Sequence, residues 1–181
     1  MREDQLDAKQ LYWSLQRLMT SSSQLRVGTH AVARELAEEV LRHSGKLVLP
    51  ASGRSMVPAI WPGDNLMVEP ATSSTVAPGD IVLFSNACRF VAHRVVEKEG
   101  DAENGQVLTR GDAMATPDAP IKSVAILGKV SFIVRNGRCF EPEKSLRRPE
   151  RAIATLLRRS ETAARVIVGV HGLSRALIKT V

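Results

Sequence analysis

"ASGRSMVPAIWPGD", residues 51–64, links two short apolar runs, "KLVLPAS" and "NLMVEP". Four more runs follow at close spacing and are rich in Val, Ile, Leu and Phe: "DIVLFS", "RFVAHRVVE", "QVLTR" and "ILGKVSFIVR". Typical turn sequences such as "PGD", "ENG" and "RNG" separate them. Short strands at this spacing predict a mainly β domain of α+β class over residues 46–143, folded as a coiled β-sheet or small barrel.

Helices are expected before this β domain. Residues 5–19 place leucines at helical spacing, and residues 29–43 repeat Ala, Val and Leu at that spacing before Gly45, a typical helix stop. We therefore predict an N-terminal helical segment over residues 1–45. A helix-turn-helix DNA reader is one alternative, but the segment has six basic and six acidic residues, and DNA binding requires an excess of positive charge.

A basic amphipathic helix is expected after the β domain. Residues 144–181 have nine basic and two acidic residues, so this tail carries the whole excess charge of the chain. Such a helix could dock on the body through its apolar face, or it could lie on an anionic membrane surface. The predicted apolar face comprises Ile153, Leu156, Leu157, Ala164, Ile167 and Val168, and the basic side comprises Arg151, Arg158 and Arg165.

Composition excludes several classes of protein. Aromatic residues are only 4% of the chain, which makes stacking on single-stranded nucleic acid an improbable function. No apolar run reaches about 18 residues, and the acidic, polar N-terminus does not read as a secretory signal. We expect a cytoplasmic protein, with the tail as a means of peripheral attachment to the inner membrane face.

Neither a metal nor a cofactor is expected. The two cysteines, Cys88 and Cys139, lack the spacing of metal ligands. Two buried free thiols are the simplest interpretation, and a disulfide between them stays open at this stage.

Ser55 lies on the tight "ASGRSMVPAIWPGD" segment, and a serine hydroxyl is a poor nucleophile unless a base takes its proton. His93 lies in "RFVAHRVVE", where Val91, His93 and Val95 share one strand face. A polar ring on an apolar face requires a partner or a function, so His93 is either a hydrogen-bonded core histidine or a general base. The remaining histidines are interpreted as surface or packing residues: His30, His43 and His171.

A histidine base needs a third group that fixes its tautomer and stabilises the imidazolium. The stretch "TRGDAMATPDAPI" offers two carboxylates, Asp112 after Gly111 and Asp118 after Pro117. Each is equally consistent with a solvated turn residue. The residues alone therefore leave both candidates open.

The order of these segments adds a further signal. "SGRSMVPAIWPGD", "PGDIVLF", "VAHRVV", "LTRGDAMATPD" and "ILGKV" resemble, in that order, blocks of the signal peptidase I and LexA-like serine peptidase superfamily. The resemblance covers roughly residues 46–135. The bacterial signal peptidase and LexA branches use a lysine base where this chain has His93. The chain is thus similar to the Ser-His-Asp branch of the endoplasmic reticulum, archaea and some sporulating bacteria.

The resemblance implies a role for each matching residue. Ser55 corresponds to the nucleophile, His93 to the general base and Asp118, six residues after Asp112, to the orienting carboxylate. Asp112 becomes a supporting turn residue.

The resemblance also implies how the nucleophile is presented. Gly53 and the residues around it would let the backbone turn sharply and present the oxygen of Ser55, whose amide could donate to an oxyanion. Met56 and Pro58 would help to form the wall of the site. Some relatives have a serine two residues before the nucleophile as a second oxyanion donor, where this chain has Gly53.

These residues predict a serine endopeptidase that cuts a leader or signal-like peptide, or a regulatory protein, after small residues through an acyl-enzyme. Self-cleavage of the LexA type, at Ala-Gly, is excluded because the chain contains no such dipeptide. The alternative is a non-catalytic peptide-binding or regulatory module on the same fold.

Overall fold

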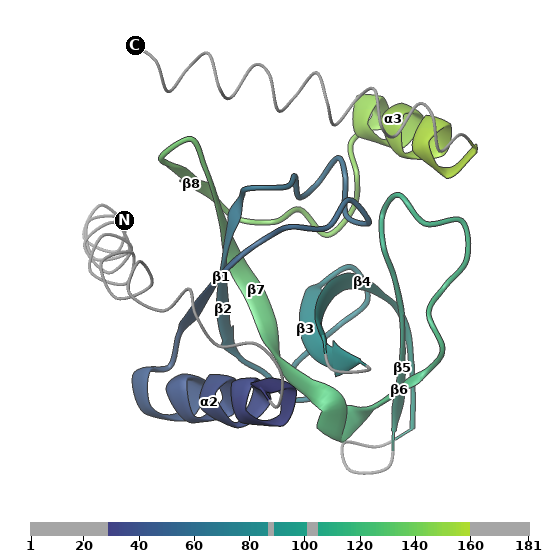
Figure 1. Ribbon diagram of the computed structural model, residues 1–181. Coiled ribbons are helices and arrows are strands. Elements are labelled where there is room, and N and C mark those ends of the chain that lie inside the picture. Colours follow the sequence, from purple (N-terminus) through teal and green to yellow (C-terminus); the bar gives the residue numbers. More distant parts are fainter. Residues whose placement is uncertain (1–28, 87–88, 101–104, 160–181) are drawn as a thin grey trace.

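The computed structural model describes residues 29–86, 89–100 and 105–159. In these ranges the chain forms one antiparallel β-sheet with two α-helices and a short 3₁₀ helix (Figure 1). The strands are β1 (Leu47–Pro50), β2 (Asn65–Pro70), β3 (Ile81–Asn86), β4 (Arg89–Glu99), β5 (Gln106–Arg110), β6 (Ile121–Lys122), β7 (Ile126–Arg135) and β8 (Arg138–Phe140). The helices are α2 (Thr29–Ser44), η1 (Ser123–Ala125) and α3 (Arg148–Arg159).

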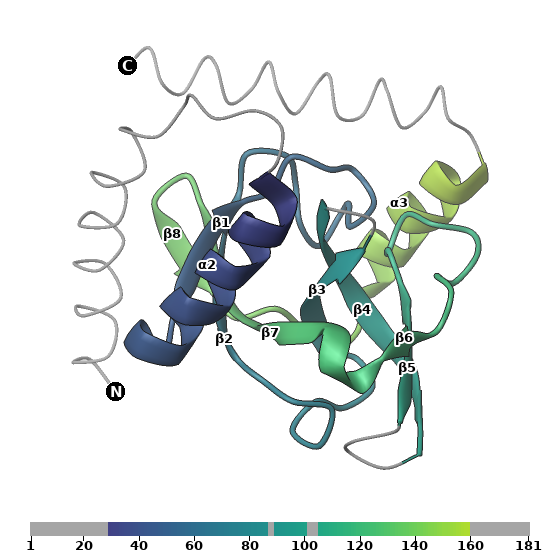
Figure 2. The same ribbon diagram turned by 60° about the horizontal axis from the view of Figure 1, so that its bottom comes forward.

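The sheet is curled but open. Its strand order is β1-β2-β7-β3-β4-β5-β6, with β8 paired to β7, and every pairing is antiparallel. Figures 1 and 2 show the strands curling around one another while α2 and α3 lie at separate places on the outside. The predicted mainly β fold with a coiled sheet is therefore confirmed, and within the described ranges no pairing between β1 and β6 closes it into a barrel.

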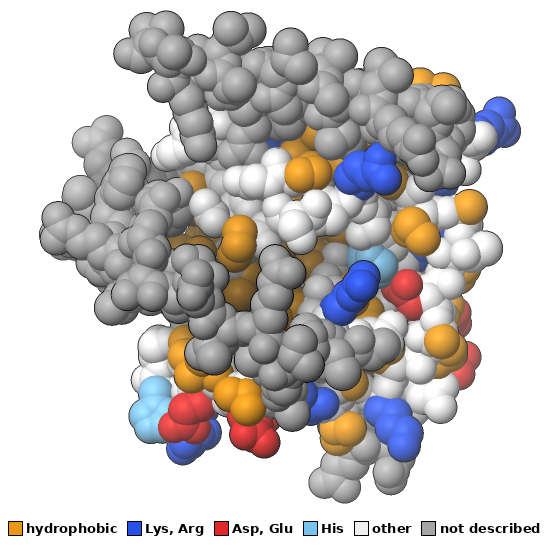
Figure 3. Space-filling view, in the orientation of Figure 1, with side chains coloured by type: hydrophobic (Ala, Val, Ile, Leu, Met, Phe, Trp, Pro, Cys, Tyr) orange, Lys and Arg blue, Asp and Glu red, His pale blue; other side chains and the backbone are white. Residues whose placement is uncertain are grey.

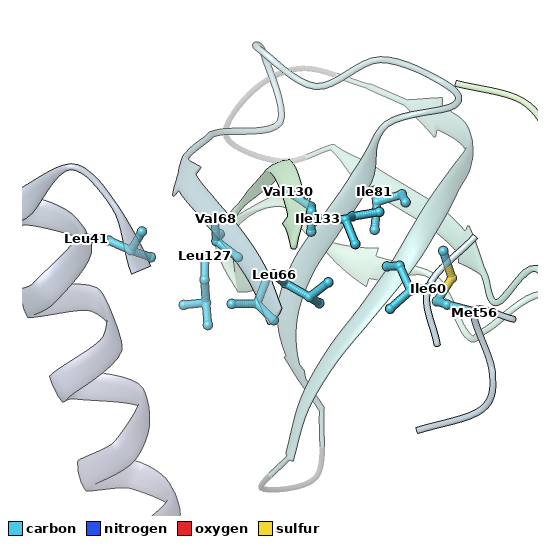
Figure 4. Packing of buried hydrophobic residues seen from close by; sticks show 10 residues of the cluster. Leu41, Met56, Ile60, Leu66, Val68, Ile81, Leu127, Val130 and Ile133 are labelled. Carbon is cyan, nitrogen blue, oxygen red and sulfur yellow. The ribbon is translucent and has the colours of Figure 1, made fainter. Parts of the chain in front are cut away.

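The sequence of the central strand β3 is continuously apolar because both faces of the strand are buried. Ile81 and Leu83 belong to one buried cluster, whereas Val82 and Phe84 belong to a second cluster on the opposite face. A strand covered on both faces needs apolar residues at every position. Figure 4 shows the first cluster, in which Leu41 of α2 points toward the sheet residues.

The two "PGD" turns are built in the same way. In each, the aspartate side chain accepts a hydrogen bond from the backbone N–H three residues earlier, at 2.8 Å for Asp64 and 3.0 Å for Asp80. The preceding glycines, Gly63 and Gly79, have φ of +88° and +94°, a region that residues with a Cβ rarely adopt. The first turn leads into β2 and thereby fixes the end of the segment that carries Ser55.

The helix predicted over residues 29–43 is confirmed as α2, and the one predicted over residues 5–19 lies outside the described residues. None of the helices in the described part of the chain is long and apolar enough to cross a membrane.

The tail prediction is confirmed as a helix for α3 only, since residues 160–181 are not described. Ala154 and Leu157 are buried against the body, but Leu156, expected on the same face, is 51% exposed. Leu156 follows Ala154 by two residues, which is about 200° around a helix, so it cannot share the docked face.

Candidate active site

Ser55 lies in a compact turn over residues 54–60, which two backbone hydrogen bonds hold in place. The backbone N–H of Val57 donates to the Arg54 carbonyl at 3.2 Å, and that of Ile60 donates to the Met56 carbonyl at 2.9 Å. Met56 and Val57 are buried. The turn therefore holds the backbone on both sides of Ser55 while the Ser55 side chain stays partly exposed.

Gly53 itself lies just before this turn. Its φ is not in the positive region, and a Cβ built there would meet no atom closer than the Ser55 Oγ at 4.0 Å. The chain is irregular through Gly53 and turns only afterwards, over residues 54–60, where hydrogen bonds close it. Met56 lines the cleft beside Ser55, whereas Pro58 is buried in the turn after a cis peptide bond.

His93 lies in β4 and faces Ser55. Its Nε2 lies 2.8 Å from the Ser55 Oγ, and its Nδ1 lies 2.6 Å from Oδ2 of Asp118. The His93 side chain is 8% exposed, and its ring packs edge-on against buried Phe84 with the centroids 6.2 Å apart. This polar ring on an apolar strand face thus has partners on both nitrogens.

Asp118 is held in place by Thr109 of β5. The Thr109 hydroxyl donates to Oδ2 of Asp118 at 2.7 Å, and the Asp118 N–H donates to the Thr109 carbonyl at 2.8 Å. Sequence reasoning missed Thr109, although a signal existed: Thr109 shares a strand face with Val107, and both are fully buried. A buried hydroxyl on an apolar strand face requires a hydrogen-bond partner.

The proton positions can be assigned from these contacts and from the chemistry of the groups. An ionised Asp118 only accepts hydrogen bonds, so Nδ1 of His93 donates to it. The neutral imidazole then presents the lone pair of Nε2 to the Ser55 hydroxyl. Chemically, this arrangement can move a proton from Ser55 to His93 while Asp118 stabilises the resulting cation.

Asp112 has a different partner. Both of its carboxylate oxygens accept from Arg94, at 2.9 and 2.8 Å, and the two side chains are 6% and 12% exposed. Arg94 also donates to the carbonyls of Gly79 and Glu143. Of the two carboxylates that the sequence left open, the structure brings Asp118 to His93 and pairs Asp112 with Arg94.

The turn that contains Asp112 packs directly behind Ser55. The N–H of Ala113 donates to the Ser55 carbonyl at 2.8 Å. A Cβ added to Gly111 would lie 2.6 Å from the Ser55 carbonyl oxygen and 2.9 Å from the Ser55 Cβ. Only glycine fits at position 111, so the close packing against Ser55, and not the turn alone, requires a glycine before Asp112.

A cleft of about 410 Å³ opens beside Ser55 and His93. Two chain segments, residues 49–53 and residues 89–93, form much of its lining. Within the described ranges β1 pairs only with β2, and β4 pairs with β5 only from Arg94 onward, so both segments have an unpaired backbone edge. Figure 3 shows hydrophobic side chains recessed in a hollow on this face, with a histidine and an acidic side chain side by side near its edge.

Cys139 is not among the described residues that line this cleft. Cys139 of β8 is a partly buried free thiol, and burial raises the pKa of that thiol. Cys88 is outside the described residues, as are His171 and the side chain of His30.

Comparison with known proteins agrees with the sequence resemblance at the level of the family. Residues 20–131, more than half of the 181, match the Peptidase S24-like family, and this span contains Ser55, His93 and Asp118. No curated protein is similar enough in sequence to count as a match. The family indicates a serine peptidase-like or LexA-type protein, and its β-rich fold agrees with the sheet described above. The chain therefore belongs to the Peptidase S24-like family.

Proposed function

We propose that this protein is a serine endopeptidase of the histidine-type branch, with Ser55 as nucleophile, His93 as general base and Asp118 as the orienting carboxylate. One observation carries the proposal. The Ser55 Oγ lies 2.8 Å from Nε2 of His93, and Nδ1 of His93 lies 2.6 Å from Oδ2 of Asp118; Ser55 and His93 line the cleft. A hydroxyl, an imidazole and a carboxylate aligned in this way are typical of nucleophilic catalysis.

The reaction follows from the proton positions. Oγ of Ser55 attacks the carbonyl carbon of the scissile bond as its proton passes to Nε2 of His93. The imidazolium, stabilised by Asp118, then gives this proton to the leaving amine, and the acyl group stays on Ser55. Water, deprotonated by the same imidazole, hydrolyses the acyl-enzyme and regenerates the hydroxyl.

The negative charge on the carbonyl oxygen needs hydrogen-bond donors. We assign one of them to the N–H of Ser55, which donates to no acceptor in the described part of the chain. Gly53 offers no side-chain donor at the position where some relatives have a serine.

The proposed substrate is an extended peptide segment, such as a leader or signal-like peptide or an exposed segment of a regulatory protein. The unpaired edges of residues 49–53 and residues 89–93 support this choice, since an extended peptide adds to a free strand edge through its main chain. The similarity to the histidine-type branch adds the expectation of small residues before the cut.

The exposed side of α3 is proposed to contact an anionic membrane surface. Arg148, Arg151 and Arg159 are exposed together with Leu156, whereas Ala154 and Leu157 pack on the body. Basic side chains beside an exposed apolar residue fit a lipid headgroup region. This surface would hold the peptidase at the inner membrane face.

A comparison of the wild-type protein with Ser55→Ala tests the proposal. Both proteins are incubated with a peptide library from digested cell protein, and new peptide termini are read by mass spectrometry. We expect cuts after small residues with the wild type only, together with a covalent fluorophosphonate adduct on Ser55. Peptide binding without cleavage by the wild type would instead support the alternative, a non-catalytic peptide-binding or regulatory module.

A further inference from the structure

The helix α3 reaches the turn behind Ser55. Nε of Arg158, in the last turn of α3, donates a hydrogen bond to the Asp112 carbonyl at 3.0 Å. Arg158 was expected on the exposed basic side of the tail, but its side chain is partly buried against the body. Since α3 lies beyond residue 131, this contact joins the span that matches the family to a segment outside it.

A single peptide group connects Arg158 to Ser55. Its carbonyl oxygen, from Asp112, accepts the hydrogen bond of Arg158, and its N–H, from Ala113, donates to the Ser55 carbonyl at 2.8 Å. A peptide group is planar and rigid, so a donor that fixes its oxygen also fixes the direction of its N–H. Hydrogen bonds in such a series also strengthen one another.

The surroundings leave this peptide group little freedom. Gly111 packs so closely on the Ser55 backbone that even a Cβ would lie within 2.6 Å of the Ser55 oxygen. Arg94 holds the Asp112 side chain, and Arg158 holds its carbonyl. Burial of Ala154 and Leu157 seats α3 in the position from which Arg158 reaches the turn.

We propose that Arg158 is a positioning residue for the nucleophile: α3, seated on the body, sets the place of the Ser55 backbone through the Asp112–Ala113 peptide group. The base is fixed separately, since Asp118 and His93 are held by Thr109 and by each other. Loss of the Arg158 contact therefore displaces Ser55 and leaves His93 in place. The inference rests on the proposed peptidase function and adds a structural control of it by the C-terminal helix.

Arg158→Met tests this role because it keeps the aliphatic stem and removes the donor. The assay measures the rate at which an activated ester or a fluorophosphonate acylates Ser55, by intact mass and per folded molecule, over a range of pH. We expect a decrease on the order of 10-fold, because small displacements of a reacting atom reduce rates steeply. The pH at which the rate is half-maximal should not move, since that value reports the His93 side.

Two further variants are the controls. Arg158→Lys restores a donor at the end of a similar stem and should recover most of the rate, whereas Arg138→Met, at an exposed position on β8, should acylate like the wild type. A wild-type rate in Arg158→Met would overturn the inference. So would a loss that Arg158→Lys does not recover, or one explained by a smaller folded fraction. If even the wild type is not acylated, the proposed function itself fails, and the inference fails with it.

Discussion

Nε2 of His93 lies 2.8 Å from Oγ of Ser55, although 38 residues separate them in the chain. The turn over residues 54–60 supplies the hydroxyl, and strand β4 supplies the imidazole. Because both supports are tied into the sheet and its turns, the contact exists before any substrate arrives. A site built in this way has little rearrangement to make during reaction.

The identity of the base can be tested with Lys129 of β7, since other branches of the superfamily that the sequence resembles use a lysine base. Lys129 pairs with Val82 in the sheet, and its Nζ lies 3.9 Å from Asp80, not beside Ser55. Lys129→Met should therefore cleave peptides like the wild type, whereas His93→Ala should lose essentially all activity. Turnover of a peptide substrate is the measurement. Loss of turnover in a folded Lys129→Met protein would contradict the assignment.

Substitution of Asp118 should lower catalytic turnover, whereas substitution of Asp112 should lower the stability of the fold. Asp118→Asn keeps the shape but permits the wrong imidazole tautomer, so we expect a decrease in turnover on the order of 10⁴ with a near-normal melting temperature. Asp112→Asn leaves Arg94 partly buried without its ionic partner, which should cost about 3 kcal/mol in the free energy of unfolding. Kinetics and urea unfolding of both variants decide the matter, and the reverse pattern would move the orienting role to Asp112.

A matched pair of glycine substitutions tests the packing behind the nucleophile. Gly111→Ala forces a Cβ into the Ser55 backbone and should cost about 1–3 kcal/mol of stability together with most of the activity. Gly53→Ala adds the same methyl group where the nearest atom is 4.0 Å away, and it should be tolerated. Thermal unfolding and acylation rates are compared for the two proteins. Equal losses would show that Gly111 has no special packing role.

The raised pKa of Cys139 predicts slow alkylation. Burial raises the pKa of this thiol, so at a given pH less of the reactive thiolate is present than in the unfolded chain. Iodoacetamide should label Cys139 along a rate–pH curve displaced to higher pH relative to the protein in urea, as read from its tryptic peptide. The free energy of unfolding should not change below the ordinary thiol pKa. It should decrease as the pH rises from there toward the raised pKa of the folded state, because the unfolded thiol ionises first. Coincident curves would contradict the prediction.

Membrane contact by α3 should depend on charge. Arg151→Gln with Arg159→Gln removes two exposed cations, each contributing about 1 kcal/mol near an anionic surface, and should weaken binding to phosphatidylserine vesicles about 30-fold at low salt. The control variant carries the same change at Arg42 and Arg138, which are exposed elsewhere. Co-sedimentation measures both. Equal binding by the two variants, or no binding by the wild type, would rule the surface out.

The strands that sequence reasoning predicted are those with enough apolar residues to show a pattern. β6 has two residues and β8 has three, so neither contains a readable alternation, and β8 exists because the turn at Asn136 and Gly137, both with positive φ, returns the chain onto β7. Pairing with a long neighbour creates such strands, and the neighbour is not visible in the local sequence.

The same limit applies to the site. Ser55, His93 and Asp118 were named from motifs, and the structure brings their side chains together. The contacts of Thr109 and Arg158 could not be predicted, because their partners lie 9 and 46 residues away in the chain. A turn near Gly53 could be expected from the sequence, but its hydrogen bonds, which begin at Arg54, could not.

In the described part of the chain, residues 49–53 and residues 89–93 each have an unpaired backbone edge, which limits the kinds of protein that can be digested. Recognition through main-chain groups depends little on side chains, but it requires that the target's own N–H and C=O groups be available. A folded protein has already engaged those groups in its helices and sheets. If the proposed function is correct, the enzyme would select its substrates by their conformation more than by their side chains. Loosely structured tails and newly made chains could bind in the cleft. Folded proteins would not be cleaved, even in the absence of an inhibitor.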